Sequence, residues 1–483
     1  MPSRPKYSNS TVVFPFQRLR TSRFCRSIDS FLRSPFYFLL LGFLTVLSAV
    51  CSMELVVYTV FVLIGVWVCF LGSDLLPLMP LTVFSYISPS FGNNPSADKQ
   101  SLFYGWQGTY LAVCACILLV CLLLRLVFDS DIGRSAFLKC KRSLLSGMLI
   151  LGVAYMLGGA FSGYYTAYGW RNALYAFLQF LSVFLCYYLF TGAVHWEKAP
   201  NSYFAWFGVC MGIILLVQLC HIYLTKNVIT HGTILRHHIY SGWGTYNNLG
   251  VMLAMAIPFA FQLSCQKKHG WLFEILALLL IGGVVLTCSR GSLLVTIVIY
   301  PISYIIMMRK RLRRTTGLVH IVLVVILIAV AFIYYEKILQ LFKNIISSGL
   351  STNGRNNLYA EGIKQFLRFP IFGGTFFPID NPPCNPLTVV EFAAFFPRSW
   401  HNTPIQMLAS CGIVGLLAYS FHRFQTIKLF FTKRTASKAF ICISLFVILA
   451  TSLLDCHFFN GCPTMFYSMA LAFAEKADTS LSE

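Results

Sequence analysis

Apolar residues along this chain gather in long blocks that are separated by short polar stretches. Most blocks run for about 17 to 22 residues, and a helix of that length crosses the roughly 30 Å hydrocarbon core of a bilayer. The block at 76–89 is short and holds Pro77 and Pro80, which are typical of a broken or re-entrant segment. The blocks predict fourteen spans, at residues 36–52, 55–72, 76–89, 109–128, 144–160, 173–192, 203–222, 248–264, 271–286, 292–308, 318–334, 403–420, 439–454 and 460–475. Allowing for broken helices, we expect an all-α integral membrane protein with about 12 to 14 transmembrane helices.

Composition excludes an ordinary soluble enzyme. Hydrophobic residues make up 57% of the chain and charged residues 11%, whereas a soluble domain carries about 25% charged residues. The net charge of +21 would suggest nucleic acid as a partner of a soluble protein. In a membrane protein, the usual excess of basic residues in cytoplasmic loops accounts for such a charge. We therefore expect the protein to contact the lipid bilayer and not nucleic acid.

The positions of Lys and Arg predict the orientation. Residues 1–34 are basic, and the apolar run after them has no small-residue cleavage pattern, so we interpret them as a retained cytoplasmic tail. If all fourteen segments cross, the basic clusters at 134–142, 267–268, 309–314 and 423–438 also lie on the cytoplasmic side. The predicted divisions are a tail (1–34), a transmembrane bundle (35–334), an extracytoplasmic loop (335–400), C-terminal transmembrane helices (401–476) and a cytoplasmic tail (477–483). Both termini are then cytoplasmic.

The loop at 335–400, called the lid loop below, is far longer than an ordinary connection, and loops of that length are usually functional or disordered. Its many aromatic residues argue against disorder. Apolar side chains spaced as on one helix face predict a short amphipathic helix that begins near Asn356 and ends before Pro370, with Gly373 and Gly374 in the following turn. We expect a partly helical lid on the outer membrane surface.

Neither metal nor any other cofactor is expected. The 17 cysteines lie mostly inside apolar runs, where thiols behave as small hydrophobes, and no C-x-x-C occurs. His231, His237 and His238 are close in sequence, but no carboxylate or Cys stands near them at ligand spacing. Phosphate-binding loops, dinucleotide fingerprints and zinc-protease motifs are absent from the sequence.

Two arginines on the predicted outer side are candidates for binding an anion. Arg290 lies in Ser289-Arg290-Gly291 between two adjacent apolar runs, hence at the tip of a helical hairpin, and Arg355 lies just before the predicted loop helix. A guanidinium clamps phosphate oxygens well because it is planar, permanently charged and bidentate. Alternatively, Arg290 is a headgroup-binding residue at a span end and Arg355 a solvated loop charge.

His401 opens the span after the lid loop, in Ser-Trp-His-Asn-Thr-Pro at 399–404. A His at the membrane interface can orient or deprotonate a hydroxyl near neutral pH. The alternative is an interfacial His beside a Trp of the aromatic belt. The residue pattern alone leaves the two interpretations even.

Four motifs occur in an order that resembles the O-antigen ligase and O-antigen polymerase superfamily of bacterial membrane glycosyltransferases. They are Gly-Thr-Tyr-Asn-Asn-Leu at 244–249, Thr-Cys-Ser-Arg-Gly at 287–291, Arg355 with Tyr359 followed by Phe366, Pro370 and the glycine pair, and His401-Asn402 leading into Gly-Ile-Val-Gly-Leu at 412–416. The resemblance covers about residues 240–420.

The resemblance implies metal-independent, inverting transfer of a glycan from an undecaprenyl-diphosphate carrier on the outer face of the bacterial plasma membrane. It implies that Arg290 and Arg355 neutralise the diphosphate leaving group and that His401 binds or deprotonates the acceptor hydroxyl. The implied partners are the lipid-linked donor, a glycan or lipid acceptor, and other polysaccharide assembly proteins. Residues in or beside the motifs are expected to bind substrate, namely Arg236, Asn247, Asn248, Tyr359, Trp400 and Asn402.

Three alternatives stay open. A polymerase joins repeat units on lipid carriers, which is the preferred interpretation, whereas an O-antigen ligase passes the glycan to lipid A core or to a protein. A polysaccharide flippase could also have fourteen spans, but it would not need a folded outer loop, and its charges would lie at mid-membrane depth. A membrane scaffold gives no reason for Arg290, Arg355 and His401 to converge.

Overall fold

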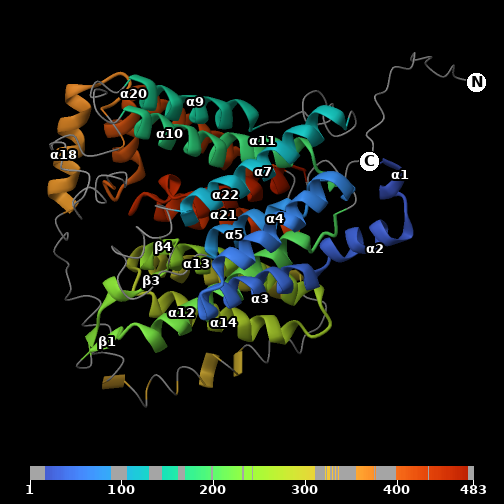
Figure 1. Cartoon of the computed structure of the whole chain (residues 1–483). Coiled ribbons are helices and arrows are strands. Elements are labelled where there is room, and N and C mark those ends of the chain that lie inside the picture. Colours follow the sequence, from blue (N-terminus) through green and yellow to red (C-terminus); the bar gives the residue numbers. More distant parts are fainter. Residues whose placement is uncertain are drawn as a thin grey trace, which may run out of the picture.

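The computed structural model describes residues 17–88, 106–129, 144–161, 169–196, 199–230, 233–241, 243–310, 355–374, 376, 399–432 and 435–476, and scattered positions within 321–336. These residues form a bundle of helices that run mostly along one common direction. Helix α18 (Arg355–Arg368) lies at one end of the bundle, and α1 (Gln17–Arg20) and α2 (Arg23–Leu32) lie at the other (Figure 1). The fold class predicted from the apolar blocks is confirmed as all-α.

The remaining helices follow the apolar blocks of the sequence. They are α3 (Pro35–Cys51), α4 (Glu54–Leu71), α5 (Leu78–Ile87), α7 (Trp106–Phe128), α9 (Leu145–Phe161), α10 (Gly169–Phe180), the π-helical η1 (Leu181–Leu185), α11 (Cys186–Gly192), α12 (Tyr203–Thr225), α13 (Tyr246–Gln266), α14 (Gly270–Leu286), α15 (Arg290–Lys310), α20 (Thr403–Phe431), α21 (Ala436–Thr451), η4 (His457–Phe459) and α22 (Gly461–Lys476). The predicted span at 318–334 lies largely outside the described residues. Helix α20 continues to Phe431, beyond the predicted end of its span at 420.

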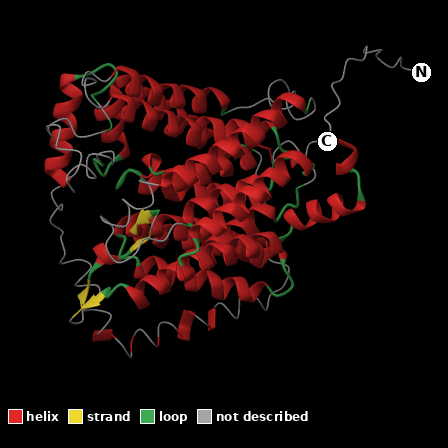
Figure 2. Cartoon of the chain, in the orientation of Figure 1, coloured by secondary structure: helices red, strands yellow, loops and turns green. Residues whose placement is uncertain are grey.

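Among the described residues, strand forms two small antiparallel hairpins between α12 and α13 (Figure 2). One pairs β1 (Ile229–Thr230) with β2 (Thr233–Ile234), and the other pairs β3 (Tyr240–Ser241) with β4 (Gly244–Thr245). The short 3₁₀ helix η3 (Arg236–His238) connects them. Together they position the start of α13 at the end of the bundle where α18 lies.

Length and apolar character identify a multi-pass membrane protein. In the described part of the chain six helices can cross a bilayer, at Glu54–Leu71, Asn172–Gly192, Tyr203–Thr225, Tyr246–Gln266, Arg290–Lys310 and Thr403–Phe431. Helices α2 and α3 form a seventh candidate that is bent by 69°. Shorter apolar helices accompany them, at Leu78–Ile87, Val113–Phe128, Leu145–Phe161, Gly270–Leu286 and Ala436–Thr451. The count of 12 to 14 crossings stays a prediction.

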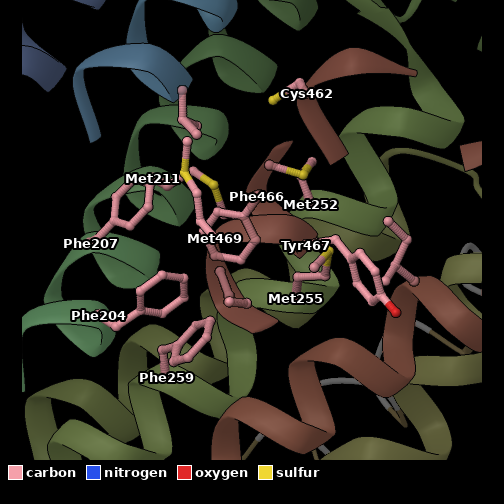
Figure 3. Packing of buried hydrophobic residues seen from close by; sticks show 14 of the residues in the cluster. Phe204, Phe207, Met211, Met252, Met255, Phe259, Cys462, Phe466, Tyr467 and Met469 are labelled. Carbon is pink, nitrogen blue, oxygen red and sulfur yellow. The ribbon is translucent and has the colours of Figure 1, made fainter. Parts of the chain in front are cut away.

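The core of the bundle lies where α12, α13 and α22 meet. Figure 3 shows Phe204 and Phe207 of α12 beside Phe259 of α13 and Phe466 of α22. The ring centroids of Phe204 lie 5.5 Å from those of Phe259 and 5.3 Å from those of Phe466, a spacing at which aromatic pairs attract. Of the six helices long enough to cross a bilayer, α13 is the most enclosed, since 94% of its most apolar 18-residue stretch is buried inside the bundle.

Small residues let the two central helices approach each other. A Cβ on Gly208 of α12 would lie 2.3 Å from the Phe259 ring, and one on Gly212 would lie 2.8 Å from Ala256 of α13. The spacing Gly-x-x-x-Gly therefore places a flat strip of α12 against α13. Such strips drive helix association in lipid, where apolar side chains gain nothing by leaving the hydrocarbon.

The end of the bundle opposite α18 is held by ion pairs. Arg33 donates to Asp74 at 2.7 Å and Arg20 to Asp129 at 2.6 Å, which ties α2 and its flanks to the ends of α4 and α7. Arg125 of α7 is fully buried and donates to the carbonyl of Gly72 at 3.0 Å. Residues 17–32 of the predicted tail thus form helices that the sequence patterns did not predict.

Candidate functional site

Arg290 lies at the tip of the predicted helical hairpin and is the first residue of α15. Cys288, two residues before it, has φ 55°, and this left-handed conformation turns the chain from α14 into α15. The Ser289 amide donates to the hydroxyl of Thr287 at 3.3 Å. On α13, Gly250 faces this turn, and a Cβ there would lie 2.8 Å from both Thr287 and Ser289. The hairpin tip is therefore fixed against the start of the central helix.

Arg236 and Arg355 join Arg290 in one arginine cluster. The charges of Arg236 and Arg355 both act on Arg290, although the three residues come from η3, the start of α15 and the start of α18. The Arg236 guanidinium also lies 5.7 Å from the centroid of the Tyr246 ring. Like charges repel, so an anion bound among the three guanidinium groups would lower the free energy of the cluster. The start of a helix, where Arg290 and Arg355 lie, adds a positive dipole end.

His401 stands just before α20 with φ 50°. A left-handed conformation costs a non-glycine residue about 1 to 2 kcal/mol and is frequent at functional sites. The chain holds it through Asn402, whose side chain accepts from the Ile405 amide at 3.0 Å and caps α20. Tyr359 of α18 donates to the His401 carbonyl at 3.3 Å. The same Tyr359 lies within the field of Arg355 and of Asp455, so it connects the arginine cluster with the histidine.

Asp455 faces His401 from the segment between α21 and α22. His401 Nδ1 lies 3.0 Å from Asp455 Oδ1, and Asn247 at the start of α13 donates to Asp455 Oδ2 at 2.5 Å. The Cys456 amide donates to Asp455 Oδ1 at 2.8 Å. A carboxylate can only accept, so Nδ1 of His401 carries a proton, and in the neutral imidazole Nε2 then has the lone pair. The arrangement makes His401 a candidate base.

Electrostatics keep Asp455 ionised and its neighbour His457 neutral. Burial acts to raise the pKa of Asp455, but the hydrogen bond from His401, together with the positive charge that His457 and His401 carry when protonated, outweighs it and holds the pKa below its ordinary value. Burial lowers the pKa of His457, against the opposing attraction of Asp455. His457 Nδ1 lies 3.2 Å from the side-chain oxygen of Asn248.

The described part of the lid loop is locked onto α20. Gly373 has φ +80° and Gly412 φ +65°, and a Cβ on Gly412 would lie 2.2 Å from the Ile371 carbonyl oxygen. Gly412 breaks the helical path of α20, and the Ile413 amide there donates to the Pro370 carbonyl at 2.8 Å. The turn after α18 thus enters the break in α20. This confirms the predicted loop helix and turn.

A cavity of about 1170 Å³, called the central cleft below, opens from this site into the bundle. His401, Asp455, Asn247 and Asn248 line one part of it, and Tyr246 lines it next to the arginine cluster. Its other walls come from α4, α5, α7, α10, η1, α11 and α22. Large cavities that join a few polar groups to apolar walls are typical ligand sites.

The structure brings together Arg236, Arg290 and Arg355 with Tyr359, His401, Asn247 and Asn248. Trp400 is 3% exposed and its ring packs near Gly362 of α18, so it supports the lid loop. Asn402 caps α20 and donates to the Leu453 carbonyl at 2.9 Å. The substrate-binding roles expected of both residues stay predictions.

The sequence patterns missed Asp455 as a site residue. Asp455 follows an apolar segment and belongs to no local motif. The one available signal was that acidic residues are scarce near the spans of this chain. Of the histidines considered for a metal, His231 and the side chain of His237 lie outside the described residues, and His238 contacts the Lys226 carbonyl at 3.3 Å. Among the described residues no cluster of three or more His, Cys, Asp or Glu could hold a metal ion.

Comparison with known families agrees with the motifs. Residues 275–420 match the family described as O-antigen ligase, and this range includes Arg290, Arg355, Tyr359 and His401. Arg236, Asn247 and Asp455 lie outside the matched range, but the fold brings them to the same site. No curated protein matches the chain. The resemblance inferred from the sequence is confirmed over residues 275–420, which match the O-antigen ligase family model.

Proposed function

We propose that the protein is a polymerase of surface polysaccharide, which joins oligosaccharide repeat units carried on undecaprenyl diphosphate. The observation that carries the proposal is that Tyr359 connects the arginine cluster with the His401–Asp455 pair. The arginine cluster can bind a diphosphate, and the His401–Asp455 pair can take the proton from a hydroxyl group. An O-antigen ligase domain supplies the class of substrate, a lipid-linked glycan.

The proposed reaction is one inverting displacement. The acceptor hydroxyl oxygen forms a bond to the anomeric carbon of the donor while the bond from that carbon to the phosphate oxygen breaks. The electron pair of the broken bond leaves with the lipid diphosphate, and the hydroxyl proton passes to Nε2 of His401 and then to water. Asp455 holds the tautomer that leaves Nε2 free to accept and stabilises the imidazolium that forms.

The arginine cluster acts on the leaving group. Negative charge grows on the phosphate oxygen as the glycosidic bond breaks, and three fixed guanidinium groups stabilise that charge without needing to reorganise. Removal of one such group typically costs 10²- to 10³-fold in rate. We propose that Arg236, Arg290 and Arg355 make a bound metal unnecessary for this step.

The proposed orientation places α18 and the site at the extracytoplasmic face. The opposite end of the bundle carries Arg20, Arg23, Arg26 and Arg33 of the N-terminal helices, in agreement with the positive-inside rule. Both termini are then in the cytoplasm of a bacterium, and the site faces the leaflet in which an exported lipid-linked glycan resides.

Purified protein incubated with a lipid-diphosphate-linked repeat unit and EDTA tests the function. The proposal predicts glycan chains longer than one unit, together with release of lipid diphosphate in equal amount to the bonds formed. Transfer only to lipid A core or a protein acceptor would make the protein a ligase. With verified native substrates, movement of the lipid-linked unit across liposomes without bond formation would make it a flippase.

A further inference from the structure

The central cleft reaches His401 but does not include the arginine cluster. His401 and Asp455 line the cleft, whereas Arg236, Arg290 and Arg355 do not. Tyr246 connects the two regions, because the residue lines the cleft and the centroid of its ring lies 5.7 Å from the Arg236 guanidinium. A diphosphate held by the arginines would therefore lie outside the cleft. A second ligand in the cleft would present its head to the candidate base.

Two amide oxygens in the cleft wall point to a ligand that carries hydroxyl groups. Gln179 of α10 is 3% exposed, and its Oε1, like Oδ1 of Asn460, is buried without a hydrogen-bond partner among the described residues. The Gln179 assignment is fixed, because its Nε2 donates to the Phe459 carbonyl at 3.3 Å. Both residues line the cleft. A buried acceptor left unpaired costs about 1 to 3 kcal/mol, and a sugar hydroxyl would satisfy it once the amide turns toward the cleft.

Away from His401 the cleft becomes apolar. Phe61 of α4, Leu122 of α7, and Leu185 and Leu189 of η1 and α11 line this arm. On α4 the lining runs from Tyr58 to Cys69, about 16 Å along a helix axis. An arm of this length parallel to the helices matches a hydrocarbon chain that lies along the lipids.

The two walls of the arm come from helices with different packing partners. Helix α7 packs on α4, whereas α10, η1 and α11 pack on α9 and α22. Leu119 on the α7 side is 50% exposed and Leu178 on the α10 side is 49% exposed, although both line the cleft. Both leucines lie on apolar helices, so we propose that this edge of the cleft faces lipid. The π-helical η1, a feature frequent at functional sites, lines the same cleft.

We propose that the central cleft is the acceptor site and that it takes a lipid-linked oligosaccharide. Its sugar lies against Gln179 and Asn460 with one hydroxyl at Nε2 of His401, and its hydrocarbon chain lies in the arm past Leu122. This inference rests on the proposed function and deepens it, because it assigns donor and acceptor to opposite sides of one base.

A pair of neighbouring leucines on α7 tests the arm. Leu122 lines the cleft, whereas Leu123 is 51% exposed and does not. In purified protein with a fixed donor, Leu122→Trp should raise the KM for a lipid-linked acceptor at least about ten-fold, which corresponds to 1.4 kcal/mol. It should leave the KM for the same glycan without lipid unchanged. Leu123→Trp should behave as wild type with both acceptors.

Gln179→Met tests the sugar end. Loss of a hydrogen bond to the acceptor should raise the KM for both forms of the acceptor by several-fold to about ten-fold, with unchanged kcat and unchanged KM for the donor. A merely structural effect would lower kcat with every substrate.

The outcomes separate the two proposals. If Leu122→Trp raises the KM for the donor instead, the arm holds the donor chain and the acceptor assignment is wrong. If wild type is active but neither variant changes any KM, the cleft is not a substrate site, although the proposed function stands. If wild type forms no glycosidic bond with any acceptor, the proposed function fails and the acceptor assignment fails with it.

Discussion

Nδ1 of His401 and Oδ1 of Asp455 lie 3.0 Å apart although the two residues are 54 positions apart in the chain. The contact joins the segment before α20 to the segment after α21, and Asn247 of α13 holds the other carboxylate oxygen at 2.5 Å. Three separate parts of the bundle thus fix one imidazole. Pre-positioning of this kind is what a general base requires.

Asp455→Asn should lower kcat for glycan transfer by about 100-fold or more, because general base catalysis contributes 10²- to 10⁴-fold. The side-chain amide introduced at position 455 can donate to Nδ1 of His401, which would move the imidazole proton to Nε2. Nε2 would then have no lone pair to take the proton of the substrate hydroxyl. Steady-state kinetics of purified protein check this prediction. Glu361→Gln, an exposed residue on α18, is the matched control and should keep wild-type kcat. An Asp455→Asn variant with wild-type kcat would show that the pair is structural.

Arg290→Lys should lower kcat about as severely as Arg290→Gln, by about 100-fold. An ammonium keeps the charge but loses the planar, bidentate fork that matches phosphate oxygens. Arg309→Lys, at the other end of α15 and exposed, controls for the substitution itself. Turnover of Arg290→Lys at the wild-type rate, at equal protein level, would instead support a headgroup anchor.

Gly412→Ala should destabilise the protein by about 2 kcal/mol or more. At φ +65° a Cβ would lie 2.2 Å from the Ile371 carbonyl oxygen, so the turn after α18 would have to leave the break in α20. Thermal unfolding in detergent measures the change. Gly282→Ala in α14, where a Cβ would meet nothing within 4 Å, should be neutral or slightly stabilising. Equal midpoints for the two variants would show that the lid loop is not locked in this way.

Acid should destabilise the site in two steps. Burial holds the folded-state pKa of His457 below its ordinary value, so stability is full above about pH 6.5 and falls as the pH drops through the folded-state pKa. The lowered pKa of Asp455 gives stability that is full above about pH 4 and falls below it. Unfolding midpoints measured against pH should lose the first step in His457→Gln and the second in Asp455→Asn. Curves parallel to wild type in both variants would contradict these pKa directions.

Much of the fold could be predicted from the apolar blocks, since a helix that crosses lipid must be apolar over its whole length. The blocks at 36–52 and 203–222 became α3 and α12 with ends within a few residues. Interruptions were harder to predict. The block at 173–192 contains the π-helical η1, and α2 is an amphipathic helix within a stretch that charge alone marks as a tail.

The candidate site was predictable where a short motif carries it. Arg290 follows from its position between two apolar runs and Arg355 from the helix pattern that starts there. Asp455 has no such local signature, because its importance comes from a contact with His401 that only the packing of α20 and α21 creates. The central cleft is likewise made by helices distant in sequence, so no sequence pattern indicates it.

The rate of glycosidic bond formation by purified protein, measured in EDTA with verified donor and acceptor, tests the central claim most directly. Wild type should form the bond, whereas Arg290→Ala, Arg355→Ala and His401→Ala should each be at least about 100-fold slower while they remain folded. Bond formation by His401→Ala at the wild-type rate, or none by wild type, would contradict the account.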